Sequence, residues 1–181
     1  MKLMIASDIH GSAFYCEKLL NAFNQENPQR LLLLGDLLYH GPRNDLPKDY
    51  APKKVISMLN AVKDKIICVR GNCDAEVDQM VLDFPIISDK ARMSIEGGHK
   101  MYFTHGHIYS VDNFPDAEKG DIVVQGHTHI PMDEMRNGIR RVNPGSVSIP
   151  KENSPHGYII FENGVLEWRD LDSRLYSSHT L

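Results

Sequence analysis

The chain has 181 residues, of which 41% are hydrophobic and 24% are charged. This length and balance predict one globular domain over residues 1–181 with a sizeable core. The formal net charge is −4 and no basic tract exceeds two residues, which disfavours a nucleic-acid partner. No apolar stretch approaches the roughly 20 residues of a membrane span. Three cysteines, an odd number, disfavour a disulfide framework and indicate a cytoplasmic protein.

The first half of the chain alternates strand and helix patterns. Apolar positions from Cys16 to Phe23 recur at helical spacing, with Ser12 as the expected N-cap. A long loop, roughly 39–51, precedes a second helix that begins at Pro52. Three apolar runs of strand length surround these helices: Lys2–Ser7, Arg30–Leu34 and Lys65–Val69. This order predicts parallel strands with right-handed crossovers.

The second half of the chain consists mostly of strand patterns. Three glycine-containing turns, Gly97-Gly98, Asn137-Gly138 and Asn163-Gly164, predict hairpins. The strands expected here are Ala91–Ile95, His99–Thr104, Asp121–Gln125, Met132–Arg136, Ile139–Val142, Gly157–Phe161 and Val165–Arg169. These are too many strands for one sheet, so we expect an α/β fold with two packed sheets and helices outside them.

Histidine is the unusual feature of the composition, because most of the nine histidines lie in short motifs with Gly or Asp. Five such motifs follow predicted strands: Asp8-Ile9-His10, Gly35-Asp36, Gly71-Asn72-Cys73-Asp74, His105-Gly106-His107 and Gly126-His127-Thr128-His129. Strand ends are where α/β proteins collect functional side chains, and glycine lets the backbone turn there without a steric cost.

Asp8 and His10 are two residues apart, so alternation in an extended chain places both on one side, where they could hold one ion. The same holds for His127 and His129, unless a bend sends them to different ions. Asp oxygen and His nitrogen together suit Mn, Fe, Zn, Ni or Co. Each motif alone is more simply a turn that hydrogen-bonds itself. Burying so many Asp and His side chains without a metal would cost on the order of several kcal/mol each, so the joint pattern indicates a metal site.

The order of these motifs resembles the calcineurin-like metallophosphoesterase superfamily. The match runs from Asp8 to Asn143-Pro144-Gly145-Ser146 and so covers most of the chain. The small size, Cys73 and the segment His40-Gly41-Pro42-Arg43-Asn44 look closest to the YfcE-like bacterial phosphodiesterases. The resemblance implies a four-layer αββα sandwich, with two mixed β-sheets flanked by helices.

The resemblance also implies two divalent metal ions. Asp8, His10 and His129 would hold the first, Asn72, His105 and His127 the second, and Asp36 would bridge both. We expect Mn²⁺, with Fe, Ni, Zn or Co as alternatives. Two ions about 3.5–4 Å apart lower the pKa of a shared water, so that a bridging hydroxide attacks phosphorus in line with the leaving oxygen. The residues expected to take part in catalysis are Asp36, Asn72, Cys73 and His105.

Cys73 departs from many relatives, which have a histidine that is thought to assist the leaving group. A thiol with a reference pKa of about 8.5 replaces poorly an imidazole with one of about 6.5. We therefore hypothesise a preference for good leaving groups, as in aryl phosphodiesters, or for one narrow natural diester. The alternative is that Cys73 is a small filler beside the site.

The loop after Asp36 supplies the expected substrate-binding residues His40, Arg43 and Asn44. Arg43 suits phosphate, although a surface salt bridge is an equal alternative. His40 lines the pocket or caps the loop. His107 is expected to orient a ligand. Residues 143–146 brace the site through hydrogen bonds or form a plain turn.

These observations predict a metal-dependent phosphodiesterase that acts on a small phosphodiester. A phosphomonoesterase with the same site is one alternative. A non-catalytic scaffold is another, because one subunit of the eukaryotic retromer coat resembles this fold. The acidic charge balance disfavours a nuclease. We expect no membrane partner, and a homo-oligomer, either a dimer or a tetramer.

Overall fold

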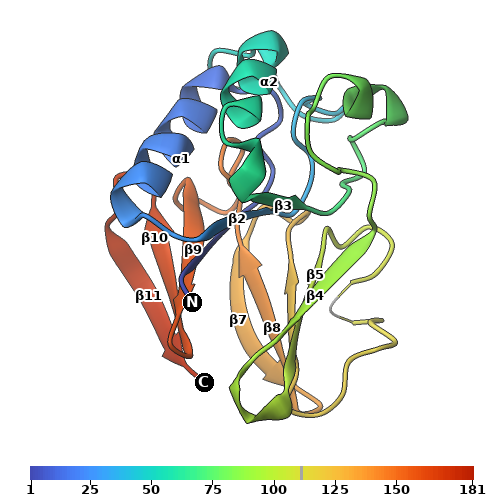
Figure 1. Cartoon of the computed structure of the whole chain (residues 1–181), viewed down its shortest axis with the longest axis vertical. Helices are drawn as coiled ribbons and strands as arrows, with labels where there is room; N and C mark the ends of the chain where they lie inside the picture. The colour runs from blue at the N-terminus through green and yellow to red at the C-terminus, as the bar shows by residue number, and fades with distance from the viewer. Residues whose placement is uncertain (111) are drawn as a thin grey trace.

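The computed structural model, which describes residues 1–110 and 112–181, contains two β-sheets packed face to face (Figure 1). The first sheet has six strands in the order β11-β10-β9-β1-β2-β3. Its members are β1 (Leu3–Ala6), β2 (Arg30–Leu33), β3 (Ile66–Cys68), β9 (Gly157–Glu162), β10 (Val165–Asp170) and β11 (Leu175–Thr180). β1, β2 and β3 pair in parallel, whereas β9, β10 and β11 pair antiparallel.

The second sheet has five strands in the order β4-β5-β6-β8-β7. Its members are β4 (Lys90–Ser94), β5 (Lys100–Thr104), β6 (Ile122–Gln125), β7 (Pro131–Arg136) and β8 (Ile139–Pro144). β5, β6 and β8 are parallel, and antiparallel strands form both edges. Both sheets are therefore mixed, and the three predicted hairpins are confirmed.

Both α-helices cover the face of the first sheet that points away from the second (Figure 1). α1 (Ala13–Glu26) begins at Ser12, whose hydroxyl accepts the backbone N–H of Tyr15, as the sequence predicted. α2 (Pro52–Asn60) begins at Pro52, also as predicted. Three short 3₁₀ helices complete the described helices: η1 (Lys63–Lys65), η2 (Glu76–Met80) and η3 (Glu96–Gly98). No described helix has the length and apolar character needed to cross a membrane.

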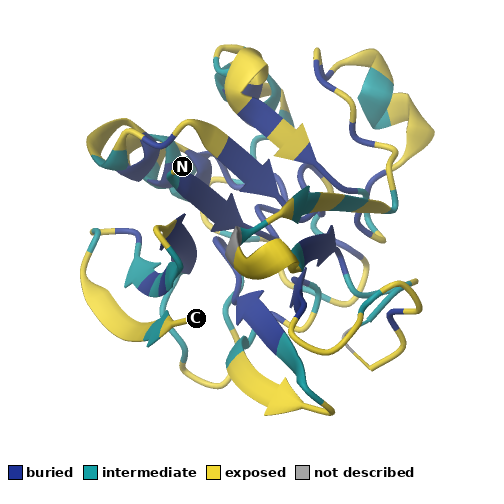
Figure 2. Cartoon of the chain, turned by 60° about the horizontal axis from the view of Figure 1, so that its bottom comes forward, coloured by how far each residue is buried: buried dark blue, intermediate teal, exposed yellow. Residues whose placement is uncertain are grey.

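The space between the sheets is a second hydrophobic core. Ile5 and Leu32 of the first sheet face Phe103 and Val124 of the second, and Trp168 of β10 is buried among them. Central strands are buried, whereas the edge strands β7 and β11 are exposed (Figure 2). This core fixes the two sheets relative to each other and so aligns the strand ends that carry the motifs.

Residues 105–110 and 112–121, which belong to the connection between β5 and β6, contribute side chains that pack on the outer face of the second sheet. Phe114 of this loop packs on Tyr102 and Val123. In the described part of the chain this fourth layer is irregular, while both α-helices lie on the first sheet. β11 was not anticipated from the sequence, because most of its residues are exposed and it lacks an alternating apolar pattern.

A matched pair of leucine truncations tests how much the core between the sheets stabilises the fold. Leu166 is fully buried in this core, whereas Leu175 on the neighbouring β11 is 52% exposed. Leu166→Ala should lower the free energy of unfolding by about 2–5 kcal/mol. Leu175→Ala should change it by no more than about 0.5 kcal/mol. Urea unfolding of both variants measures the difference, and equal losses would contradict the assigned core.

Candidate metal centre

The five motifs converge where the carboxyl ends of parallel strands from both sheets meet. Asp8 and His10 follow β1, Asp36 follows β2, and Asn72 follows β3. From the second sheet, His105 follows β5, and His127 and His129 follow β6. A continuous series of side-chain contacts joins all seven residues.

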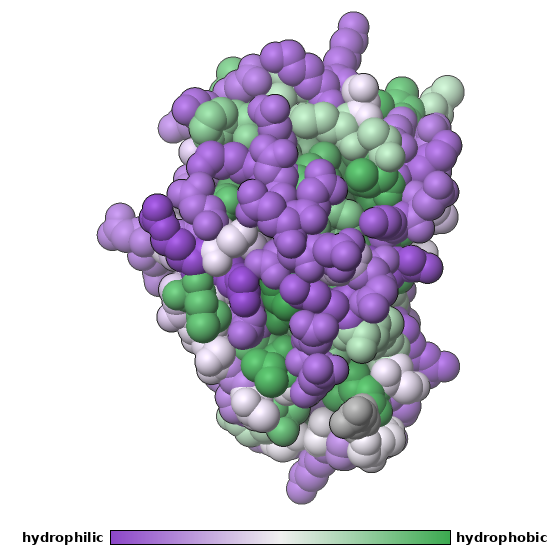
Figure 3. Space-filling view, turned by 60° about the vertical axis from the view of Figure 1, so that its left-hand side comes forward, coloured by the Kyte–Doolittle hydropathy of each residue, from purple (hydrophilic) through white to green (hydrophobic). Residues whose placement is uncertain are grey.

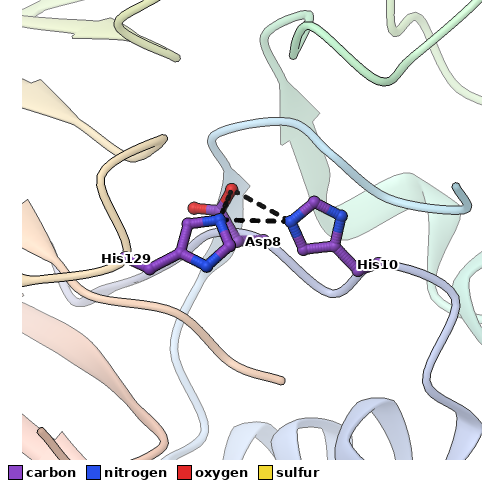
Figure 4. A group of neighbouring side chains, drawn as sticks. All are labelled: Asp8, His10 and His129. Atoms are coloured by element: carbon purple, nitrogen blue, oxygen red, sulfur yellow. Dashed lines mark hydrogen bonds and ion pairs between the residues drawn. The ribbon is translucent and has the colours of Figure 1, made fainter. Parts of the chain in front are cut away.

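The first group consists of Asp8, His10 and His129, which point toward one another (Figure 4). The Oδ1 atom of Asp8 lies 3.2 Å from Nε2 of His129 and 3.6 Å from Nε2 of His10. The two imidazole nitrogens are 3.2 Å apart. All three side chains are buried, and Asp8 Oδ1 has no hydrogen-bond partner in the described structure. A buried carboxylate oxygen beside two imidazole nitrogens fits a divalent transition-metal ion.

The second group is centred on Nε2 of His105. This nitrogen lies 3.0 Å from Oδ1 of Asn72, 3.2 Å from Nδ1 of His127 and 3.5 Å from Oδ2 of Asp36. The same Asp36 oxygen is 3.7 Å from Nε2 of His10 in the first group. Asp36 therefore lies between the two groups.

Asp8 and His10 reach one group as expected, but the backbone at these residues turns and does not follow the alternation of an extended chain. Asp8, His10, Asp36, His127 and His129 all have positive φ, between 49° and 67°. Non-glycine residues adopt this region at a cost of about 1 kcal/mol or more, and such strain concentrates at functional sites. The left-handed turn sends His127 toward His105 and His129 toward Asp8, which is the bend left open by the sequence.

Backbone carbonyls orient three of the histidines. Nδ1 of His10, His105 and His129 lies 2.8, 2.7 and 2.6 Å from the carbonyl oxygens of Tyr39, Leu34 and Ile149, respectively. Each ring therefore donates its Nδ1–H and presents the lone pair of Nε2 to the centre.

His107 was expected to orient a ligand, and the structure does not place it in that role. Its ring centroid lies 5.3 Å from that of His105. Its buried Nδ1 has no hydrogen-bond partner in the described structure. The backbone carbonyls, which leave no signal in a sequence, take this role instead.

Asp74 organises the loops that carry Asp36, a role that its motif did not predict. Its carboxylate accepts the backbone N–H groups of Asp36 and Leu37, both at 2.8 Å, and of Gly71 at 2.7 Å. Gly71 is required for close approach, because a Cβ there would lie 2.1 Å from Oδ1 of Asp36. The backbone N–H of Cys73 donates to that oxygen at 2.7 Å. The loop after β3 thus fixes the carboxylate between the two groups.

Residues 143–146 brace the site and are more than a plain turn. The Asn143 amide donates to the carbonyl of Gly126 at 2.8 Å and to the hydroxyl of Thr128 at 3.0 Å. Ser146 and Ser148 both donate their hydroxyls to the carbonyl of Asp8, at 3.0 and 2.9 Å. Ser148 was not singled out by the sequence analysis. These bonds hold the turns that carry the two motifs nearest the first group.

Burial and opposite charge shift the protonation of these groups in opposite directions. Burial alone would raise the pKa of Asp8, but the close imidazoles of His10 and His129 outweigh it and hold the pKa well below the usual value. Burial alone would lower the pKa of His105, but Asp36 and Asp8 raise it to about 9. Without a metal, Asp8 and Asp36 therefore favour protons on His10 and His105, and a cation would replace those protons.

Of the loop residues expected to bind substrate, His40 and Asn44 contact each other, and a Cβ on Gly41 between them would lie 3.2 Å from Sγ of Cys73. Asn44 donates its amide to the carbonyl of His40 at 2.8 Å, and His40 packs edge-on against Tyr50. Arg43 is exposed and forms no ion pair in the described structure, so the surface salt bridge considered above is absent there.

Cys73 lies next to the metal-centre residues. Its Sγ accepts a hydrogen bond from the Asn72 amide at 3.2 Å. The same sulfur lies within 4.8 Å of a ring nitrogen of His10 and of a carboxylate oxygen of Asp36. Burial raises the pKa of this thiol, and the Asp36 carboxylate raises it further. The thiol therefore stays protonated, and its high pKa makes it a weak acid toward a leaving group.

Known proteins are similar to this chain in sequence and in architecture. The profile of the calcineurin-like phosphoesterase superfamily domain matches residues 1–164. Phosphodiesterase YfcE of Escherichia coli (strain K12) is 51% identical over 166 residues, which cover 92% of this chain and 90% of the relative. Phosphodiesterase MJ0936 of Methanocaldococcus jannaschii is 28% identical over 153 residues, covering 80% and 83%.

Two solved structures are similar to this chain over nearly its whole length. The structure of YfcE, a phosphoesterase from E. coli, has a TM-score of 0.94 and 48% identity and covers 99% of both chains. Vacuolar Protein Sorting 29 from Cryptosporidium parvum has a TM-score of 0.59 at 18% identity, covering 99% and 98% of the two chains, and so shares the fold alone.

The shift at His105 predicts how the stability of the metal-free protein depends on pH. The pKa of His105 is about 9 in the folded chain, against an ordinary 6.5. Its stabilising contribution is therefore complete below pH 6.5 and is lost as the pH rises toward 9. Urea unfolding in EDTA should show a loss of up to about 1.4 kcal/mol per pH unit from this group. His105→Gln should flatten the slope, and an unchanged slope would contradict the assignment.

Proposed function

Because the chain belongs to the calcineurin-like phosphoesterase superfamily, we propose that it is a metal-dependent phosphodiesterase with a binuclear centre. The observation that carries this proposal is the position of Asp36, whose Oδ2 atom lies 3.7 Å from His10 and 3.5 Å from His105. One carboxylate thus contacts both groups of metal-ligating side chains. The two relatives described above are named phosphodiesterases, which supports the same activity here.

The proposed ligands of the first ion are Asp8, His10 and His129, and those of the second are Asn72, His105 and His127, with Asp36 shared. When bound, two divalent ions would supply an activated water at neutral pH and offset charge on the phosphoryl oxygens. Mn²⁺ is the proposed metal because Asp and Asn contribute oxygen ligands beside the imidazoles.

The chain's own residues prepare this chemistry. The carbonyls of Leu34 and Tyr39 fix the His105 and His10 rings, so no reorientation is needed when substrate arrives. The amide oxygen of Asn72 adds a ligand without adding negative charge that would repel a phosphate. We propose that His40, Arg43 and Asn44 bind the substrate from the loop above Cys73, with Arg43 as the group that suits a phosphate oxygen.

A phosphodiester is the proposed substrate class rather than a monoester. The raised pKa of the Cys73 thiol makes it a weak proton donor, which favours substrates whose leaving group needs little assistance. A non-catalytic scaffold remains the second candidate, because structures of vacuolar protein sorting 29 share the fold. The ligand-capable side chains kept at all seven positions favour the enzyme.

We further propose that the protein works in the cytoplasm and as a homo-oligomer of two or four chains. The uneven number of cysteines supports the first proposal. Light scattering of the purified protein measures the number of chains in the oligomer directly.

Hydrolysis of bis(p-nitrophenyl) phosphate tests the activity. The metal-stripped protein should be inactive, and Mn²⁺ should restore release of nitrophenol, faster than from the matching monoester. Asp36→Asn should lower the rate on the order of 100-fold or more, because it removes the shared charge between the groups.

Asp83→Asn is the matched control, because Asp83 forms an exposed ion pair with Lys63 and its loss should leave the rate unchanged. If neither ester is turned over with any divalent metal, the scaffold becomes the leading candidate.

Substitution of Cys73 tests the origin of substrate preference. Cys73→His introduces an imidazole that can stabilise or protonate a leaving group, so it should raise activity toward esters with poor leaving groups by at least about tenfold. Nitrophenyl diesters, which leave readily, should change little. Rates across a series of esters with increasing leaving-group pKa measure the effect. If the dependence of rate on leaving-group pKa is unchanged, the hypothesis is wrong, and in catalysis Cys73 only fills space beside the site.

A further inference from the structure

Cys73 is the only residue of the five motifs that offers a sulfur atom, since the other polar side chains there carry oxygen or nitrogen. Its Sγ, a ring nitrogen of His10 and a carboxylate oxygen of Asp36 all lie within 4.8 Å of one another. This third group shares His10 and Asp36 with the two groups described above, but its sulfur belongs to neither of them. Among the described residues, Cys16 and Cys68 lie in no such group.

The backbone holds the thiol beside the carboxylate. The N–H of Cys73 donates to Oδ1 of Asp36 at 2.7 Å, so the loop after β3 fixes the cysteine next to that side chain. His10 is fixed independently, because its Nδ1 lies 2.8 Å from the carbonyl oxygen of Tyr39. His10 and Asp36 are buried, whereas Cys73 is partly exposed. An ion that arrives from solvent at the sulfur therefore meets two oriented ligands behind it.

The size of this group suits a large, soft ion. Three atoms that are at most 4.8 Å apart all lie within about 2.8 Å of one common point. Zinc bonds to such ligands are shorter than this limit, at about 2.0–2.3 Å. Cadmium belongs to the same group of elements but is larger and softer, so it spans the three atoms with less movement. Thiolate ligands select soft ions, whereas Mn²⁺ prefers oxygen ligands.

One side chain of the group cannot serve two ions at once. An imidazole has a single lone pair on its unprotonated nitrogen, and the Nδ1–H of His10 is already directed at the carbonyl of Tyr39. Nε2 of His10 therefore binds either an ion beside Asp8 and His129 or an ion beside Cys73. Occupation of one position removes a ligand from the other.

We propose that Cys73, His10 and Asp36 form a site for one soft divalent ion of the cadmium class, and that this ion excludes Mn²⁺ from the first group. The thiol proton passes to water as the metal–sulfur bond forms, and the thiolate offsets one of the two charges of the ion. Binding of the soft ion needs only these three side chains. Its competition with Mn²⁺ rests on the proposed binuclear centre.

Titration of the metal-stripped protein with Cd²⁺ tests the site, because a cadmium–thiolate bond adds an ultraviolet charge-transfer band that oxygen and nitrogen ligands do not produce. The band should saturate at one ion per chain. Cys73→Ser should abolish it and should weaken Cd²⁺ binding, measured by calorimetry, at least about tenfold. Near-ultraviolet circular dichroism shows that each variant keeps the native fold.

A second variant separates a built site from a thiol that binds cadmium alone. His10→Gln keeps the sulfur and removes one ligand, so half-saturation of the band should require at least about tenfold more Cd²⁺. His179→Gln on the edge strand β11 is the matched control and should leave the titration unchanged.

Cys16→Ala is the matched control for the cysteine. α1 lies on the side of the molecule that Figure 3 brings forward, where most surface side chains are hydrophilic, and Cys16 of α1 is fully buried. Ions in solvent do not reach this thiol, so Cys16→Ala should keep the full band.

Competition is measured on protein loaded with Mn²⁺. Cd²⁺ should release at least one Mn²⁺ per chain, detected by the electron paramagnetic resonance signal of the free ion, and Cys73→Ser should release at least about tenfold less at the same Cd²⁺ concentration.

Three results would overturn the site: no band in the natural protein, a band that persists in Cys73→Ser, or a titration that His10→Gln does not change. Cd²⁺ binding that leaves two Mn²⁺ ions in place would contradict the exclusion. A normal cadmium titration in a protein that binds no Mn²⁺ and hydrolyses neither ester would support the site and count against the proposed function alone.

Discussion

The burial of Asp8 against two histidines is the constraint on which the rest of the site depends. A carboxylate removed from water is stable only when positive charge or hydrogen-bond donors surround it. Here the backbone N–H of His127 donates to one oxygen of Asp8, and the backbone turns through left-handed conformations to bring the rings of His10 and His129 to the other oxygen. The strain of those turns is held by Ser146 and Ser148, which bond to the carbonyl of Asp8. A metal ion between that oxygen and the two rings would satisfy the carboxylate more completely.

Local signals carried the parts of the fold that the sequence predicted correctly. Ser12 caps α1, Pro52 begins α2, and glycine turns close the predicted hairpins, because each depends on neighbouring residues only. β11 escaped prediction because Leu175–Thr180 pairs through its backbone while leaving most side chains in solvent. The layer on the outer face of the second sheet escaped because Phe114, Tyr109 and Ala117, which pack there, follow no periodic apolar pattern.

The site was predictable as a set of residues and not as a geometry. The spacing of the motifs identified the side chains, and the structure brings them into contact. The sequence could not reveal that backbone carbonyls such as Leu34 fix the imidazoles, since every residue has a carbonyl. Nor could it reveal Asp74, which acts by accepting three backbone N–H groups from loops far apart in the chain. The role of Gly71 as a point of close approach likewise appears only when Asp36 lies against it.

The two ends of the sandwich differ in chemistry, although the same core lies between the sheets. At one end, polar side chains follow the carboxyl ends of the parallel strands of both sheets. At the other the sheets leave a cavity with an apolar floor. Trp168 links this core to the metal-centre end of the molecule. It is buried between the sheets and donates its indole N–H to the carbonyl of Asn143 at 2.8 Å. Asn143 in turn holds the turn that carries His127 and His129.

Anomalous scattering from a crystal of the protein soaked in Mn²⁺ tests the central claim most directly. The account predicts two anomalous peaks, one beside Asp8, His10 and His129 and one beside Asn72, His105 and His127, with Asp36 between them. A single peak that Asp36 does not touch, or no peak at a concentration that saturates the enzyme, would contradict a binuclear centre.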